Sequence, residues 1–191
     1  MIHFTADLHL SHKKVILYQN RPFESVQDMN DALITYWNLK VDPDDLVYIL
    51  GDFAFFGSRD ILPRLNGKKI LLPGDHDQDA LNQARGFFLD IVPLINLSAK
   101  EGLPHARELL KQYDLSITLC HWCMRVWRKS HYNSWHLYGH SHGRLEPIGK
   151  SWDVGVDNNN FMPLSLLDVI EIMKTRPDNP NLVKKKYEET C

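Results

Sequence analysis

Five short apolar runs, each ending at aspartate or histidine, constrain the fold of this chain more than any other feature. Each run has the length and composition of a buried strand. In layered α/β sheets the carboxyl ends of the strands line a common crevice, so side chains far apart in the sequence can meet there. The residues that follow the runs are Asp7, Asp52, Asp75, His121 and His140. We therefore expect an α/β protein whose strand ends converge on one cluster of ligands.

The residues between these runs predict alternating helices and strands. Val26, Met29, Leu33 and Trp37 recur at helical spacing behind Ser25, a plausible N-cap, so an amphipathic helix of about four turns is expected. Strands are expected at 2–6, 46–50, 69–72, within 87–97, at 115–120 and at 135–138. Other helices are expected at 12–18, 60–65 with Ser58 as its cap, 78–85 with Asp77 as its cap, 104–113 and 164–173, and a hairpin at 144–148 and 151–156.

The length of 191 residues fits a single domain, which we place at 1–173, with a tail of marginal order at 174–191. A formal net charge of -2 gives no global attraction to nucleic acid or to an anionic membrane. No apolar stretch has the length of a transmembrane helix, and no secretory segment is evident at the start, so we expect a cytoplasmic protein. Cys120 and Cys123 form a C-x-x-C pair, which we interpret as ordinary thiols because no second pair completes a zinc site. Nothing indicates an obligate protein partner.

Two pairs of candidate ligands are separated by a single residue. Asp7 and His9 form one pair, and His140 and His142 form the other. In an extended backbone, side chains at i and i+2 share a face, so each pair is expected to point into one space. With Asp52, Asp75 and His121 the set has seven members, more than one catalytic zinc takes. Two divalent ions sharing a carboxylate would use them all, and Asp52 is the natural bridge.

The ordered motifs resemble those of the calcineurin-like metallophosphoesterases, above all the small single-domain bacterial and phage members. The resemblance spans residues 1 to about 173 and rests on Asp7-x-His9, Gly51-Asp52, Gly74-Asp75-His76-Asp77, His121 and Gly139-His140-x-His142. It implies an α/β/β/α sandwich of two mixed sheets flanked by helices. It assigns Asp7, His9 and His142 to one metal and His121, His140 and Asp75 to the other, with Asp52 bridging. Manganese, zinc, nickel and iron all suit such ligands.

The resemblance also implies a reaction, the hydrolysis of a phosphate monoester or diester. A hydroxide that bridges the metals would attack phosphorus, and His76 would assist the leaving group, so Asp52 and His76 are the expected catalytic residues. Asp77, beside His76, is expected to support the site from behind or to cap a helix. The family pattern has asparagine where this chain has Asp75. We expect the extra negative charge to keep or tighten metal binding while lowering turnover or changing the preferred metal.

The sequence leaves the substrate open. His12, Arg125 and His131 are candidate substrate-binding residues, and a surface or solvated-loop position is an equal alternative for them. The aromatic and basic loop at 125–134 is compatible with a nucleotide, or the end of an RNA or DNA strand, as substrate. A metal-binding scaffold of the same fold with little catalysis is the alternative from a different class.

Overall fold

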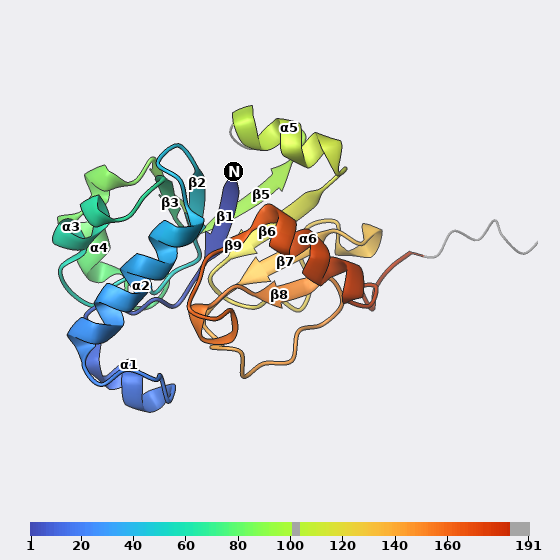
Figure 1. The fold of residues 1–191 in the computed structure, drawn as a ribbon. Helices are drawn as coiled ribbons and strands as arrows, with labels where there is room; N and C mark the ends of the chain where they lie inside the picture. The colour runs from blue at the N-terminus through green and yellow to red at the C-terminus, as the bar shows by residue number, and fades with distance from the viewer. Residues whose placement is uncertain (101–103, 184–191) are drawn as a thin grey trace, which may run out of the picture.

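Two mixed β-sheets lie face to face at the centre of the protein (Figure 1). The computed structural model describes residues 1–100 and 104–183. The first sheet has the order β4-β3-β2-β1-β9, in which only β9 is antiparallel to its neighbour. Its strands are β1 (Ile2–Thr5), β2 (Leu46–Ile49), β3 (Lys68–Leu71), β4 (Asp90–Ile91) and β9 (Leu164–Ser165).

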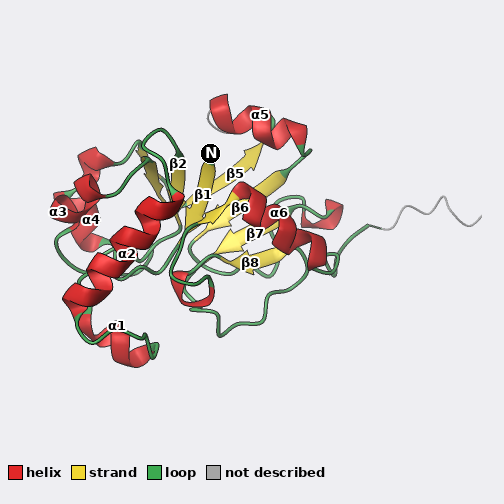
Figure 2. Ribbon diagram, in the orientation of Figure 1, coloured by secondary structure: helices red, strands yellow, loops and turns green. Residues whose placement is uncertain are grey.

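The second sheet has the order β5-β6-β7-β8, with β5 antiparallel and the other strands parallel. Its strands are β5 (Leu94–Ser98), β6 (Ser116–Cys120), β7 (Trp135–Tyr138) and β8 (Ser151–Asp153). Figure 2 shows the strands at the centre and the helices around them. The helices are α1 (Lys13–Tyr18), α2 (Val26–Lys40), α3 (Ser58–Ile61), α4 (Gln78–Gln83), α5 (Pro104–Gln112) and α6 (Leu166–Thr175).

The first sheet is buried on both faces because its side chains alternate between two apolar clusters. Val47 and Ile49 of β2 pack with Met29, Leu33 and Trp37 on α2. The alternate residues of the same strand face the second sheet and α6, together with residues of β6 and β7. A strand buried on both faces is an apolar run, which is why the sequence showed runs and not alternation. The expected α/β fold with two mixed sheets flanked by helices is confirmed.

Helix α2 begins as its sequence indicated. The Ser25 side chain accepts a hydrogen bond from the Asp28 backbone amide at 3.0 Å. Helix α6 begins at Leu166, two residues later than expected, because Ser165 caps it through a reciprocal pair of bonds with Asp168. The preceding residues Leu164–Ser165 instead form β9 against β1.

Several local expectations were wrong. The hairpin does not form: residues 144–148 are a loop, and β8 pairs in parallel with β7. Helix α3 begins at Ser58 behind Gly57, and the Ser58 side chain is buried without capping it. The side chain of Asp77 does not cap α4, because it accepts backbone amides from the loop after β2 and from Gly74 in its own loop.

The packed chain continues past the expected domain end at residue 173. Helix α6 runs to Thr175, and Asn179 beyond it is buried. The Asn179 side chain donates to the carbonyls of Ser130 and Ser134 at 2.9 Å each. Residues 178–183 of the expected tail therefore hydrogen-bond to residues 130–134, and residues 184–191 of that tail lie outside the described residues.

Candidate metal centre

Two groups of three His and Asp side chains lie beside each other at the carboxyl ends of the parallel strands. In each group the potential ligand atoms lie within 4.8 Å of one another, so each group could hold a metal ion. The first group follows β1 and β7, and the second follows β2, β6 and β7. The groups are Asp7, His9 and His142, and Asp52, His121 and His140. The resemblance likewise separated Asp7, His9 and His142 from His121 and His140, but it also placed Asp75 with the latter pair, and Asp75 is in neither group.

Asp52 faces both groups. Its Oδ2 lies 3.3 Å from Nε2 of His9, in the first group, and its Oδ1 lies 3.7 Å from Nε2 of His121, in the second. The carboxylate is almost fully buried, so water does not satisfy it. Of the ligands in the two groups, Asp52 is the one whose oxygens point toward histidines of both.

Five of the six ligands in the two groups lie on left-handed and not extended backbone. The φ angles are 57° at Asp7, 49° at His9, 53° at Asp52, 65° at His140 and 50° at His142. The reasoning that placed each i, i+2 pair on one face of an extended strand was therefore wrong, although Asp7 and His9 do share a group. Strained backbone of this kind costs about 1–3 kcal/mol per residue and persists only where the surroundings fix it. The turns direct His140 and His142 to different groups.

Hydrogen bonds fix the protonation pattern of two ligand histidines. Nδ1 of His121 lies 2.7 Å from the carbonyl oxygen of Leu50, which can only accept, so this nitrogen carries the proton. Nδ1 of His142 likewise lies 2.6 Å from Oδ2 of Asp157. In both rings Nε2 is then the nitrogen that is left to bind a metal.

Unpartnered polar atoms show that a cation fits this site. Among the described residues, Nε2 of His121 and Nδ1 of His9 are buried and have no hydrogen-bond partner. Buried polar atoms of this kind are costly unless something pairs with them. Imidazole nitrogens and carboxylate oxygens together suit borderline or hard divalent metals.

The electrostatics of the first group also favour a bound cation. Burial, with the neighbouring carboxylates of Asp153 and Asp52, raises the pKa of Asp7 well above its usual range. Burial, with the charges of His142 and Arg21, lowers the pKa of His9 to about 2, so the ring is neutral. A divalent cation would restore the ionised form of Asp7 and would meet no opposing charge on His9.

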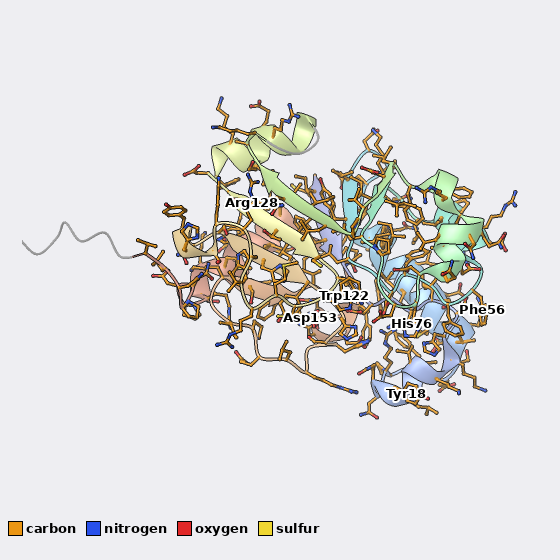
Figure 3. The ribbon with its side chains drawn as sticks, turned by 180° about the vertical axis from the view of Figure 1, so that it is seen from behind. Tyr18, Phe56, His76, Trp122, Arg128 and Asp153 are labelled. Carbon is orange, nitrogen blue, oxygen red and sulfur yellow. The ribbon has the colours of Figure 1, made fainter. Side chains whose placement is uncertain are left out.

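Asp75 and His76 lie at the open side of the centre. Oδ2 of Asp75 is 3.5 Å from Nδ1 of His140, and both side chains are about half exposed. Asp75 therefore adjoins the second group without belonging to it. His76 belongs to neither group; its ring centre is 5.3 Å from that of His9, and its backbone amide donates to Asp52 Oδ1 at 2.9 Å. Figure 3 shows the exposed His76 side chain at this end of the molecule.

A cavity of about 390 Å³ opens over both groups. His12 lines it, with its ring stacked on Phe55 at 4.6 Å between centroids. Arg125 does not reach this cavity, because it lines a separate hollow with Trp127 and Ile148. His131 is exposed elsewhere on the same loop and contacts Tyr132. The structure thus places His12 at the centre and the other two candidate substrate residues away from it.

A buried arginine, which the sequence did not single out, supports the first group. Arg21 is 4% exposed and donates to both oxygens of Asp157 at 2.8 Å. It also donates to the carbonyls of Asp7 and Leu8. Burial opposes the ionisation of Asp157, but the hydrogen bonds from His142 and Arg21 outweigh it and lower the pKa of Asp157. Arg21 thus stabilises the left-handed turn at Asp7 and, through Asp157, the orientation of His142.

The carboxylates of two other aspartates connect the ligand-bearing loops through hydrogen bonds. Asp77 accepts the backbone amides of Asp52, Phe53 and Gly74 at 2.7–2.9 Å. Asp153 accepts hydrogen bonds from the Ser141 hydroxyl and the Gly143 amide. Asp153 is the last residue of β8, and Asp157 lies four residues beyond it, but β8 has the sequence Ser-Trp-Asp and is not an apolar run, so the pattern that indicated the ligands did not indicate these two. It did not indicate Arg21 either.

Glycines at the strand ends leave room for the ligands. Gly51 has a φ of +83°, and a Cβ there would overlap the His121 ring. At Gly74 a Cβ would overlap Oδ1 of Asp52 and come within 2.7 Å of Nε2 of His121. Glycine is therefore required at both positions for the second group to form.

The fold and site together define an α/β protein with two adjoining His/Asp groups suited to metal ions. No family model matches the chain. It is 28% identical over 185 residues to the uncharacterized protein MJ1445 of Methanocaldococcus jannaschii, with 91% of each chain covered. It is also 28% identical over 160 residues to the gene 66 protein of Mycobacterium phage D29, covering 74% of this chain and 78% of that protein.

A solved structure shares the fold. The protein of unknown function AQ665 from Aquifex aeolicus aligns with a TM-score of 0.65 over 90% of this chain and 98% of its own, at 20% identity. This likeness supports the architecture and says nothing about the reaction. None of the helices in the described part of the chain is long and apolar enough to cross a membrane.

Proposed function

We propose that this protein hydrolyses phosphate esters with two divalent metal ions. The position of Asp52 carries the proposal, because one buried carboxylate faces His9 on one side and His121 on the other. Two ions sharing a carboxylate, about 3.5–4 Å apart, are the arrangement used for displacement at phosphorus. The likeness of the ordered motifs to the calcineurin-like metallophosphoesterases supports the same reaction.

Asp7, His9 and His142 would hold one ion, and His121 and His140 the other, with Asp52 shared. Asp75 is close enough to His140 to complete the second set. Divalent ions bound here would make hydroxide available near neutral pH and offset the negative charge of the phosphoryl oxygens. Manganese, zinc, nickel and iron all match this donor set.

The protein's own residues divide the remaining tasks. Arg21 and Asp157 hold His142 with Nε2 free, and Asp77 holds the Asp52 and Gly74 loops together. His76 stands in the cavity beside His9 without joining either group, so its imidazole is free to donate a proton to the departing oxygen. His12 and Phe55 bound the cavity on the side of α1.

The proposal includes a cytoplasmic location and no obligate protein partner. Cys120 and Cys123 are free thiols, and neither belongs to a candidate metal group in the described residues. Free thiols fit a reducing compartment.

Metal content and hydrolysis of aryl phosphate monoesters and diesters test the proposal, with protein purified without added metal and then loaded with Mn²⁺ or Zn²⁺. Asp52→Asn should lose most bound metal and most activity. His76→Ala should keep the metal and lose about 10²–10⁴-fold in rate. His131→Ala, a histidine outside the cavity, is the matched control. If the protein binds two ions but hydrolyses no ester, the metal-binding scaffold is favoured instead. Full activity in the His76→Ala variant would refute the role of His76 in protonating the departing oxygen.

A further inference from the structure

A second hollow, of about 240 Å³, lies apart from the cavity over the metal groups and shares no lining residue with it. Three segments form it: the loop after β6, the loop before β8 and the chain that follows α6. Its lining is mostly apolar, with one cationic and one amide side chain, and consists of Arg125, Val126, Trp127, Ile148, Pro180 and Asn181. Figure 3 shows Arg128, on the same loop as Arg125, well separated from His76. The hollow is therefore a site of its own.

Hydrogen bonds hold the walls of this hollow in place. The indole of Trp127 is almost fully buried and donates to the Ser134 carbonyl at 3.0 Å. The Asn181 side chain donates to the Ser130 hydroxyl at 2.8 Å, which joins the chain after α6 to the same loop. On the third wall, the Ile148 amide donates to a serine hydroxyl of β8 at 3.1 Å. The hollow is preformed, so a ligand need not order its walls on binding.

Aliphatic side chains of the hollow remain open to solvent. Val126 is 66% exposed and Ile148 is 42% exposed. The one aromatic ring in the lining, that of Trp127, is only 6% exposed and presents little surface on which a nucleobase could stack. An aliphatic side chain of a partner matches these walls better, because such an anchor fills a small apolar hollow and removes both surfaces from water.

The charge around the hollow is positive. Residues 115–145 contain no aspartate or glutamate, although the chain has 24 acidic residues. The basic residues in this stretch are Arg125, Arg128, Lys129 and Arg144. Arg125 and Lys129 are exposed, and neither side chain has a hydrogen bond or ion pair within residues 1–100 and 104–183. Two unpaired cations beside an apolar hollow favour a partner that carries negative charge.

The carboxylates on the adjoining walls are already engaged. Glu146, in the loop before β8, lies 3.6 Å from the Arg176 guanidinium. Asp178, after α6, accepts a hydrogen bond from the Asn133 side chain at 2.6 Å. Neither of them pairs with Arg125, which is left to meet a carboxylate from outside the chain.

We propose that this hollow binds an acidic segment of a partner protein, an extended peptide in which one aliphatic side chain is flanked by aspartate or glutamate. The aliphatic side chain packs against Val126 and Ile148. A carboxylate beside it pairs with Arg125, and Lys129 adds a second positive charge on the same loop. The anchor provides most of the affinity, and the charges orient the peptide. This site is separate from the metal groups, so the inference does not depend on the proposed function.

A labelled peptide tests the site directly. The probe is a fluorescein-labelled pentapeptide of sequence Asp-Glu-Leu-Glu-Asp, and its binding is followed by fluorescence anisotropy. EDTA is present so that the peptide carboxylates cannot bind a metal ion in the other cavity. We expect a Kd on the order of 100 µM at low salt, rising several-fold at about 0.3 M salt. Alanine in place of the leucine should weaken binding about tenfold.

A double variant with a matched control locates the binding. Arg125→Ala/Val126→Ser removes the unpaired cation and one exposed wall of the hollow. The control, Arg85→Ala/Leu89→Ser, removes an arginine and an aliphatic side chain that are exposed elsewhere. The first variant should bind the leucine peptide about tenfold or more weakly, whereas the control should match the wild type. All four side chains are exposed, so both variants should fold, and circular dichroism checks this.

Two kinds of result would overturn the proposal. One is equal affinity for the leucine and alanine peptides, or an unchanged affinity in Arg125→Ala/Val126→Ser. The other is tighter binding of a five-nucleotide oligouridine than of the peptide, lost in the same variant, because the hollow would then be a site for nucleic acid. These measurements need neither metal nor turnover, so their outcome is independent of whether the protein hydrolyses esters.

Discussion

Replacing Arg21 by methionine should destabilise the protein strongly, even without metal. Arg21 is buried and donates to both oxygens of Asp157 and to the carbonyls of Asp7 and Leu8. Methionine retains the length of the chain and its apolar contacts but leaves the Asp157 carboxylate buried without its cation. Removing one partner of a buried ion pair costs about 3–5 kcal/mol.

A double-mutant cycle separates the ion pair from simple packing. Asp157→Asn neutralises the partner, so Arg21→Met should cost about 2 kcal/mol less in that background than in the wild type. The measurement is urea unfolding followed by tryptophan fluorescence, in EDTA at pH 7.5. Arg64→Met is the control, because its ion pair with Asp31 is solvent-exposed and should contribute little to stability.

The metal-binding readout links this pair to the site. Asp157→Asn weakens the hydrogen bond to Nδ1 of His142, so the affinity of the first group for a metal ion should fall about 10- to 100-fold. Additive costs in the cycle would refute the reasoning, as would a loss below about 1 kcal/mol in Arg21→Met. Either result would mean that Arg21 and Asp157 are not a coupled unit.

Two further predictions concern His136 and Gly74. Burial lowers the pKa of His136 to about 4, and the neutral ring hydrogen-bonds to the Thr118 carbonyl and the Met124 amide. Between about pH 6.5 and 4 the folded state therefore binds fewer protons than the unfolded state. The free energy of unfolding should therefore fall by about 2 kcal/mol from this group as the pH drops from 7.5 to 5. The His136→Phe variant should be less stable at pH 7.5, but its free energy of unfolding should fall by about 2 kcal/mol less over the same range. Parallel plots of unfolding free energy against pH for the two proteins would contradict the assignment. Gly74→Ala should leave the fold intact but displace Asp52 and weaken metal binding more than about tenfold in calorimetry, whereas Gly86→Ala, whose Cβ meets nothing within 4 Å, should match the wild type.

The parts of the fold that the sequence predicted well are determined locally. Helix α2 has a cap at Ser25 and an apolar stripe that ends at Trp37, and both signals lie within its own residues. The parallel strands were recognisable because burial on two faces makes them continuous apolar runs. Their carboxyl ends meet at one edge, and this alone was enough to bring ligands as distant as Asp7 and His142 into one group.

The parts that were missed depend on contacts between distant segments. Asp77 would cap a helix in isolation, but its carboxylate instead accepts the amides of Asp52 and Phe53 from the loop after β2, together with that of Gly74 in its own loop. The pairing of Arg21 with Asp157 joins residues 136 positions apart, and no local pattern reports it. The left-handed turns at the ligands fall on aspartate and histidine, which adopt positive φ more often than most residues, but this preference is too weak to locate a turn from the sequence, so an extended backbone was the wrong assumption for His140.

The spacing of the first metal group along the chain determines when it can form during synthesis. The carboxylate of Asp7 accepts the backbone amide of His140, 133 residues later. A nascent chain therefore carries Asp7 and His9 through most of its translation without His142, and it buries Arg21 only when Asp157 has left the ribosome. A metal ion held by all three residues of the first group would therefore stabilise only those chains in which His142 has already been synthesised.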